Sequence, residues 1–252
     1  MTTHTTRNVF LTAAIVACIG TGVTASTVSW GTAGTFAVLG NQSVTSAGAT
    51  TIDGDLGVSP GTSITGSPTV TGTIHINNAT ATQAQADANT AYNLLIGLAV
   101  TQTLASQLGG TTLTPGVYKF TSEADLTGDL TLSGQGEYIF QIGSTLITAA
   151  NSKVKLTNGA VWEDVFFAVG SSATLGADTD FFGNIIAHTS DTLGANASVN
   201  GRVIALGGSV SLYDGSYVVI PEPSSAALLL VGVVTLLVAK RRTFTTCSDN
   251  VV

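Results

Sequence analysis

The sequence predicts a mainly β protein, a three-sided, discontinuous β-solenoid (β-helix) with one long α-helix packed along its flank. Ser-x-Thr/Ser-Leu tetrapeptides recur at residues 172–175, 190–193 and 209–212, at a nearly constant interval. The stretches "NIIA" (184–187) and "RVIA" (202–205) repeat at a similar interval. A single other segment has apolar residues at helical spacing instead. A fixed repeat of about 20 residues indicates structural units stacked in a row, each burying its apolar side against the next.

The repeat continues toward the N-terminus. "TIDGDLGV" (51–58) and "TVTGTIHI" (69–76) share one pattern and lie one repeat apart, and a similar interval separates "SVT" (43–45) from "SIT" (63–65). Apolar and polar residues alternate between clusters of Gly, Asn and Asp. This pattern predicts one short strand on each side of the solenoid and a turn at each corner.

Alternation also predicts which side chains face the core. The residues expected to point inward are Ala173, Leu175, Leu193, Val210 and Leu212. Asp191 takes an inward position as well and does not fit the pattern. We expect Asp191 to cap a turn or to mark a locally wider turn of the solenoid.

The segment that breaks the β pattern covers residues 80–108. Its apolar residues at helical spacing are Ala84, Ala88, Ala91, Tyr92, Leu95, Leu98 and Ala99. The polar stretch before it supplies capping residues, and Gly109-Gly110 is expected to end it. A single helix with one apolar stripe is expected to cover one flank of the solenoid.

Composition excludes several classes of function. Only 9% of residues are charged, and between residues 26 and 220 four basic residues stand against 13 acidic ones. Phosphate binding requires basic patches, so nucleic acid is excluded as a partner. Cys18 and Cys247 both lie outside this range, so we expect no disulfide and no cysteine-based metal site in the domain. The sequence contains no phosphate loop or nucleotide-binding fingerprint, and we expect no cofactor. A surface with few charges and many hydroxyls suits an exported protein.

Residues 1–25 have the features of a secretory signal peptide. Arg7 precedes an apolar run from Val9 to Ile19, and Val23-Thr24-Ala25 supplies a small-residue cleavage pattern. The run is too short to span a bilayer. Lipoprotein processing at Cys18 is the alternative. Either route exports the chain, and the folded domain is expected to cover residues 26–220.

Residues 221–252 resemble a PEP-CTERM sorting signal. Pro221, Glu222 and Pro223 are followed by an apolar run from Ala226 to Ala239, and a basic cluster follows that run: Lys240, Arg241 and Arg242. The resemblance implies recognition by membrane sorting machinery, transient anchoring through residues 226–239, removal of the tail, and an extracellular or cell-surface location. Ten residues follow the basic cluster, which departs from the usual pattern. A plain membrane anchor is the alternative, with the basic cluster on the cytoplasmic side.

Residues 31–218 resemble the microbial ice-binding protein family. The stretches that carry the resemblance are "GTAGTFAVLGNQSVT" (31–45), "TIDGDLGVSPGTSITG" (51–66), "AQADANTAYN" (84–93), "LTPGVYKF" (113–120), "GEYIFQIGSTL" (136–146) and "VFFAVGSSATLG…FFGNIIA…NGRVIA" (165–205). The resemblance implies a discontinuous β-solenoid with a helix alongside, and ice or ordered water as the ligand. Function does not follow from the fold alone.

The repeated hydroxyls are the candidate ice-binding face. Outward residues two apart on a strand are ~6.7 Å apart and neighbouring strands ~4.7 Å apart, so stacked Ser and Thr form a regular lattice. The candidate residues are Ser43, Thr45, Ser63, Thr65, Thr145, Ser172, Thr174, Ser190, Thr192, Ser209 and Ser211, with Thr131 as a further member. A strand around Ala177, Thr179, Ala195 and Ser198 is the second candidate. The simpler interpretation is that Ser and Thr occupy solvent-facing strand positions, where Thr is favoured.

The sequence does not predict an enzyme. The pairs Asp53/Asp55 and Asp178/Asp180 could share a strand face, as a glycosidase or lyase requires, or occupy corners, where Asp favours turns. His75 and His188 lack the spacing of metal ligands. The resemblance to the ice-binding protein family implies a secreted protein that binds ice and inhibits its recrystallisation, and we expect it to be a monomer. The alternative is a non-catalytic matrix protein associated with exopolysaccharide.

Overall fold

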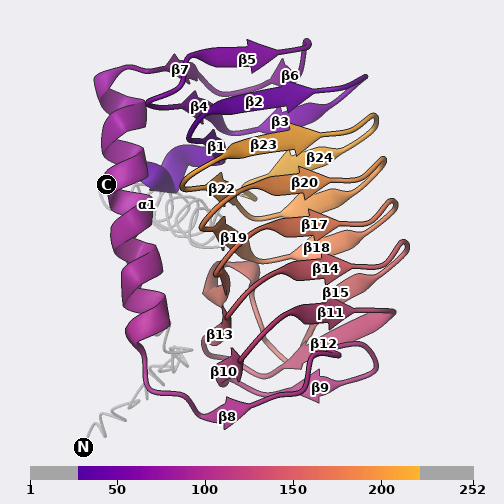
Figure 1. The fold of residues 1–252 in the computed structure, drawn as a ribbon. Helices are drawn as coiled ribbons and strands as arrows, with labels where there is room; N and C mark the ends of the chain where they lie inside the picture. The colour runs from indigo at the N-terminus through magenta and orange to yellow at the C-terminus, as the bar shows by residue number, and fades with distance from the viewer. Residues whose placement is uncertain (1–27, 222–252) are drawn as a thin grey trace, which may run out of the picture.

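The computed structural model describes residues 28–221, so the signal peptide expected from the sequence and all of the expected sorting segment except Pro221 lie outside the described residues. The described chain winds into a β-solenoid with three parallel sheets, and the helix runs beside the stack (Figure 1). The predicted fold class is confirmed. Within residues 28–221 no helix combines the length and hydropathy needed to cross a bilayer.

Each side of the solenoid is one sheet of hydrogen-bonded strands. Sheet A has the order β7 (Ile74–Ile76), β4 (Asp55–Val58), β1 (Phe36–Gly40), β22 (Val203–Ala205), β19 (Asn184–Ala187), β16 (Val165–Val169), β13 (Tyr138–Ile142), β10 (Gly116–Phe120) and β8 (Gln102–Thr103). Sheet B has the order β5 (Ser63–Thr65), β2 (Ser43–Ser46), β23 (Ser209–Leu212), β20 (Asp191–Leu193), β17 (Ala173–Leu175), β14 (Leu146–Thr148) and β11 (Ala124–Leu126). Sheet C has the order β6 (Thr69–Val70), β3 (Thr51–Asp53), β24 (Tyr217–Val219), β21 (Ser198–Asn200), β18 (Asp180–Phe182), β15 (Lys153–Thr157), β12 (Asp129–Ser133) and β9 (Thr112–Leu113).

The solenoid is discontinuous in sequence although continuous in space. Strands β1 to β7 form the rungs at one end, and α1 (Ala79–Gly97) then carries the chain to the opposite end (Figure 1). The later strands return rung by rung until β22, β23 and β24 pair in parallel with β1, β2 and β3. The N-terminal strands β1, β2 and β3 are therefore hydrogen-bonded to the strands of the C-terminal rung, β22, β23 and β24.

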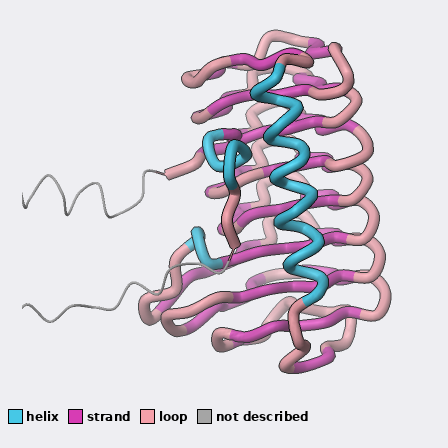
Figure 2. Tube along the Cα trace, turned by 90° about the vertical axis from the view of Figure 1, so that its left-hand side faces the viewer, coloured by secondary structure: helices cyan, strands magenta, loops and turns pink. Residues whose placement is uncertain are grey.

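The helix covers sheet A, as Figure 2 shows, and is shorter than predicted. Asn78 caps it, since Oδ1 accepts a hydrogen bond from the Ala81 backbone at 2.9 Å. The buried side of the helix meets the outer residues of sheet A, and the buried residues at this contact are Ala84, Ala88, Ala91, Leu95, Phe36, Phe166, Ile186 and Ile204.

The expected helix end at residue 108 is wrong. Leu98 is already extended, with ψ of 146°, and residues 102–103 form β8 at the edge of sheet A. The backbone of Gln107 forms an isolated parallel β-bridge with Asp125 of β11, at the edge of sheet B. Three β-branched residues lie in this stretch, Val100, Thr101 and Thr103, and they favour extended backbone where a sheet edge can accept it.

The interior is filled by the side chains that alternation predicted to point inward. Ala173, Leu175, Leu193, Val210 and Leu212 are each at most 1% exposed. Aromatic rings form a continuous row in the interior between β10 and β18. Tyr118–Phe140 and Phe140–Phe167 are stacked, with centroid distances of 5.6 Å and 4.4 Å, and Phe167–Phe181 is tilted at 4.8 Å. Aromatic pairs of both kinds add to the stability that burial provides.

Asp191 does not cap a turn. It is 1% exposed inside the solenoid, in register with Ala173 on one side and Val210 on the other. Neither carboxyl oxygen has a hydrogen-bond partner. Burial raises the pKa of this carboxyl well above its usual value, because removal from water penalises the charged form.

Two short 3-10 helices are held against sheet A by one buried cation. They are η1 (Gly31–Thr35) and η2 (Trp162–Asp164). The guanidinium of Arg202 donates to the Gly34 carbonyl at 2.6 Å and to Asn184 Oδ1 at 3.0 Å. Asn184 in turn donates to the Trp162 carbonyl at 3.2 Å. Arg202 therefore links both segments to β22 and β19.

Candidate functional site

The outer face of sheet B carries two aligned columns of hydroxyl side chains. We call the first the threonine column, which consists of Thr65, Thr45, Ser211, Thr192 and Thr174. Each member is the direct register partner of the next. The second, the serine column, lies two residues earlier on each rung and consists of Ser63, Ser43, Ser209, Ser190, Ser172 and Thr145. The structure thus brings all eleven candidate residues onto one face.

Several of these hydroxyls are fixed by hydrogen bonds between rungs. Ser43 Oγ donates to Ser209 Oγ at 2.8 Å, and Thr65 Oγ1 donates to Thr45 Oγ1 at 3.1 Å. Ser190 Oγ accepts from the Ser209 backbone at 3.2 Å. Such bonds hold side chains in one rotamer and so reduce the entropy lost when a ligand binds.

The rigidity of the face comes from the layer beneath it. The side chains that alternate with the columns, among them Val44, Val210 and Leu193, are almost completely buried. Each strand also pairs in parallel on both sides except at the two ends of the sheet. The backbone that carries this face can therefore move little without disturbing the core.

The hydroxyl lattice ends near β14, before the last strand of sheet B, β11. In the threonine column, Thr174 is followed on β14 by Ile147, which is 44% exposed, and on β11 by Asp125. The serine column reaches one strand further, to Thr145, because Leu146 pairs with Ala173. From β5 to β14 the two columns contain no charged side chain.

The other two sides of the solenoid differ from sheet B. Sheet A is covered by α1. Sheet C carries charged groups, including Lys155, whose Nζ donates to Asp129 at 2.6 Å, and Lys153, 4.0 Å from Asp180. Thr131, expected as a further member of the lattice, lies on sheet C between Thr112 and Lys155. That expectation is wrong because Thr131 belongs to a different side of the solenoid.

The second candidate strand does not form a face. Thr179 is 1% exposed and shares a hydrogen bond of 2.9 Å with Thr148 beneath the corner between sheets B and C. Ser198 lies on sheet C, where it donates to Asp180 at 2.9 Å. Ala177 and Ala195 are corner residues beside Asp178 and Asn196, both of which have a φ of 56°.

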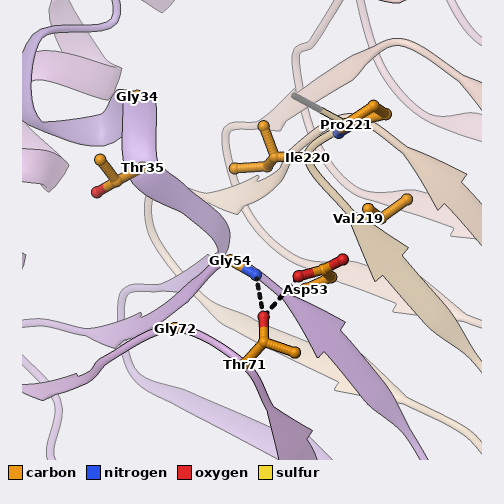
Figure 3. Close-up of a pocket in the computed structure, with 9 residues that line it drawn as sticks. All are labelled: Gly34, Thr35, Asp53, Gly54, Thr71, Gly72, Val219, Ile220 and Pro221. Atoms are coloured by element: carbon orange, nitrogen blue, oxygen red, sulfur yellow. Dashed lines mark hydrogen bonds between the residues drawn. The ribbon is translucent and has the colours of Figure 1, made fainter. Parts of the chain in front are cut away.

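The acidic pairs considered from the sequence are separated by corners. Asp53 ends β3 on sheet C, where its carboxylate accepts a hydrogen bond from Thr71, whereas Asp55 begins β4 on sheet A. Figure 3 shows Asp53 in a hollow lined mainly by glycine backbone and by residues 219–221. Asp178 occupies a corner and Asp180 a strand. Within residues 28–221 no three His, Cys, Asp or Glu side chains are grouped to hold a metal ion.

Comparison with known proteins identifies the family. The family described as "Ice-binding-like" matches residues 38–217. The chain belongs to this family. An ice-binding protein from Nostoc sp. (strain HG1) is 47% identical over 234 residues, covering 85% of this chain and 87% of that protein. One from Flavobacterium frigoris (strain PS1) is 34% identical over 206 residues, covering 73% and 74% respectively.

Solved structures of ice-binding proteins have the same fold. The ice-binding protein of the Antarctic ascomycete Antarctomyces psychrotrophicus superposes with a TM-score of 0.75 at 42% identity, covering 78% of this chain and 99% of that chain. An ice-binding protein from an Arctic yeast, in a structure that addresses its antifreeze activity, gives 0.72 at 32% identity, covering 78% and 96%. Sheet B and its hydroxyl columns lie within the region that the family matches.

Sequence reasoning missed Ile147 as an outward member of the face. The interval along the chain from Ile147 to Thr174 is longer than the one from Thr174 to Thr192, so the tetrapeptide pattern does not extend to this rung. The available signal was the "TLIT" stretch at residues 145–148, in which Leu146 and Thr148 alternate with Thr145 and Ile147.

Proposed function

We propose that this member of the ice-binding family binds ice through the outer face of sheet B and so inhibits ice growth and recrystallisation. The observation that carries the proposal is the alignment of two uncharged hydroxyl columns, in register over five rungs of a parallel sheet. The relatives named as ice-binding proteins support it. The face is a binding surface, and no catalytic step is assigned to it.

The geometry suits a crystalline ligand. Rungs repeat every ~4.7 Å and the two columns are ~6.7 Å apart, so the hydroxyls form a two-dimensional lattice. Water molecules that bond to fixed hydroxyls are held at regular positions, and the methyl groups of Thr45, Thr65, Thr174 and Thr192 limit competing hydrogen bonds. Ordered water of this kind joins protein and ligand with little loss of enthalpy. The absence of charge on the columns leaves this water free of strong local fields.

We propose that the protein acts outside the cell as a monomer. The apolar run of residues 9–19 and its cleavage pattern support export, and residues 221–252 support sorting or transient membrane anchoring through residues 226–239. The same C-terminal segment supports the second candidate function, a non-catalytic matrix protein associated with exopolysaccharide. That function requires no effect on ice.

The test compares two matched threonines on different sides of the solenoid. Purified protein is expected to shape ice crystals and to slow recrystallisation. Thr192→Tyr on sheet B should abolish most of this effect, since a ring projecting from the lattice separates the flat face from a crystal plane. Thr131→Tyr on sheet C is the control and should leave it intact. If the unmodified protein has no effect on ice, the matrix function is favoured. If both variants act like the unmodified protein, sheet B is not the binding face.

A further inference from the structure

At one end of the solenoid, apolar side chains in core positions are exposed to solvent. We define the terminal rung as β5, β6 and β7, within residues 63–76, which form the last strand of each sheet at this end (Figure 1). Ile74 and Ile76 are 49% and 48% exposed. Their register partners one rung further in, Leu56 and Val58, are completely buried. The two isoleucines occupy core positions for which the described chain supplies no covering rung.

The terminal rung is also free of formal charge. Residues 56–86 contain no Asp, Glu, Lys or Arg, and His75 is the single titratable side chain among them. Exposed sheet edges are commonly protected by charged side chains that oppose pairing or burial. Placing this rung against an apolar environment therefore requires the desolvation of no charged side chain of the rung itself. The nearest carboxylates, Asp53 and Asp55, belong to the next rung inward, where they accept hydrogen bonds from Thr71 and from the Thr73 backbone.

The chain leaves the described body beside this rung. Pro221 lines the hollow in Figure 3 together with Thr71 and Gly72 of the terminal rung. Val219 pairs with Asp53, and Asp53 accepts a hydrogen bond from Thr71 on its other side. The exit strand is thus two strand spacings from the rung, ~10 Å.

The apolar run that follows begins close by. Four residues, 222–225, separate Pro221 from the run at 226–239, and the extended chain from Pro221 to Ala226 reaches at most ~18 Å. A bilayer that holds this run therefore lies within reach of the exit strand, and the terminal rung is two strands away from that strand. A second exposed apolar group, Leu94, Ile96 and Val100, lies near the opposite end of the stack, where α1 ends. A bilayer that rests end-on against the terminal rung would not reach that group.

We propose that the terminal rung is the surface that rests on the lipid bilayer while the C-terminal segment anchors the protein. This inference rests on the anchoring included in the proposed function. Ile74 and Ile76 would enter the interfacial region, where buried apolar area favours binding. The solenoid would then stand end-on, with the outer face of sheet B perpendicular to the membrane and open to ice. Because the chain has a net charge of −7, a zwitterionic bilayer is the appropriate partner to test.

The experiment places an environment-sensitive dye at one position at a time in the full chain. Cys18→Ser and Cys247→Ser remove the native thiols, and Ile76→Cys, Ile96→Cys or Thr103→Cys supplies the site; all three positions are exposed. With phosphatidylcholine vesicles, dye at residue 76 should show a blue shift in emission, whereas dye at residues 96 and 103 should not. Adding Ile74→Asp should cancel the shift at residue 76, since the charge opposes insertion.

Each other outcome overturns a defined part of the inference. A shift at residue 96 or 103, or at all three positions, contradicts end-on contact. A blue shift at residue 76 in the absence of vesicles also contradicts the inference. If that shift depends on protein concentration, a second copy of the chain covers the terminal rung. If the shift is independent of protein concentration, the C-terminal segment covers the rung. If the full chain fails to bind vesicles, or if a chain ending at Pro221 binds equally well, the C-terminal segment does not anchor the protein. The proposed contact between the terminal rung and the bilayer is then wrong as well.

Discussion

Thr174 and Thr192 are direct register partners on β17 and β20, and both side chains point away from the core. They lie in the lower half of the threonine column, with Ser211 above and Ile147 below. A bulky side chain at Thr192 would therefore interrupt the threonine column, and one at Thr174 would block its last hydroxyl.

Thr174→Tyr and Thr192→Tyr should separate activity on ice from stability. Each should remove most of the inhibition of recrystallisation, because the ring prevents close approach of the remaining hydroxyls. Exposed substitutions of this kind change the free energy of unfolding by less than about 0.5 kcal/mol. Urea unfolding measured beside an ice recrystallisation assay checks both expectations. Loss of activity accompanied by a large fall in stability would instead indicate a damaged fold.

Ile147 offers a test of how far the lattice extends. Ile147→Thr continues the threonine column onto β14 without a change of backbone, since Thr is also β-branched. We expect this variant to equal or exceed the unmodified protein in slowing recrystallisation. Ile147→Asp should lower the activity by bringing charge one strand closer to Thr174. Equal activity in the two variants would place the lower boundary of the binding face above β14.

The regular part of the site could be predicted because it depends on local alternation and a fixed repeat. Ser190 and Ser209 are separated by one repeat of the sequence and lie on neighbouring rungs, so their alignment follows from the period. The end of the helix could not be predicted in this way, since residues 102–103 leave the helical pattern to pair with β10. Thr131 was placed on the wrong side because one repeat contains three sides, and alternation alone does not tell which side a strand occupies.

Arg202 is predicted to be essential for holding η1 and the preceding Trp30 against sheet A. Its guanidinium lies 4.9 Å from the ring centroid of Trp30 and 5.5 Å from that of Trp162. Burial lowers the pKa of this group to about 10, so it remains charged at neutral pH. Arg202→Met would leave the Gly34 carbonyl and the Asn184 amide without their partner, at a cost of about 1–3 kcal/mol for each buried polar group.

Arg202→Lys provides the matched control for charge. Lys keeps the cation, but it lacks the planar group that stacks on both indoles and donates in two directions. We expect both variants to unfold at lower urea concentration and to expose Trp30, with a red shift in tryptophan emission. Stability restored fully by Lys would show that charge alone, without stacking and the paired hydrogen bonds, holds the segment.

Asp191 is predicted to limit the stability of the protein at neutral pH. Its folded-state pKa is raised by burial above the usual value of 3.8, so between these two values the native state holds a proton that the unfolded state has released. Stability contributed by this group is present in full below about pH 3.8 and decreases as the pH rises toward the folded-state pKa, by linkage. Asp191→Asn should remove this decrease, because the amide does not titrate.

Asp191→Val should go further, because it also removes the buried polar atoms that lack hydrogen-bond partners and matches Val210 on the next rung. Burial of an unpaired polar group costs about 1–3 kcal/mol in proteins, and the gain at pH 7 should be of this order or larger. Urea unfolding of the three proteins at pH 4 and pH 7 measures both effects. The expected order at pH 7 is Asp191→Val, then Asp191→Asn, then the unmodified protein. If the unmodified protein is the most stable of the three at pH 7, the carboxyl has a partner inside the solenoid and the assignment of an isolated buried acid is wrong.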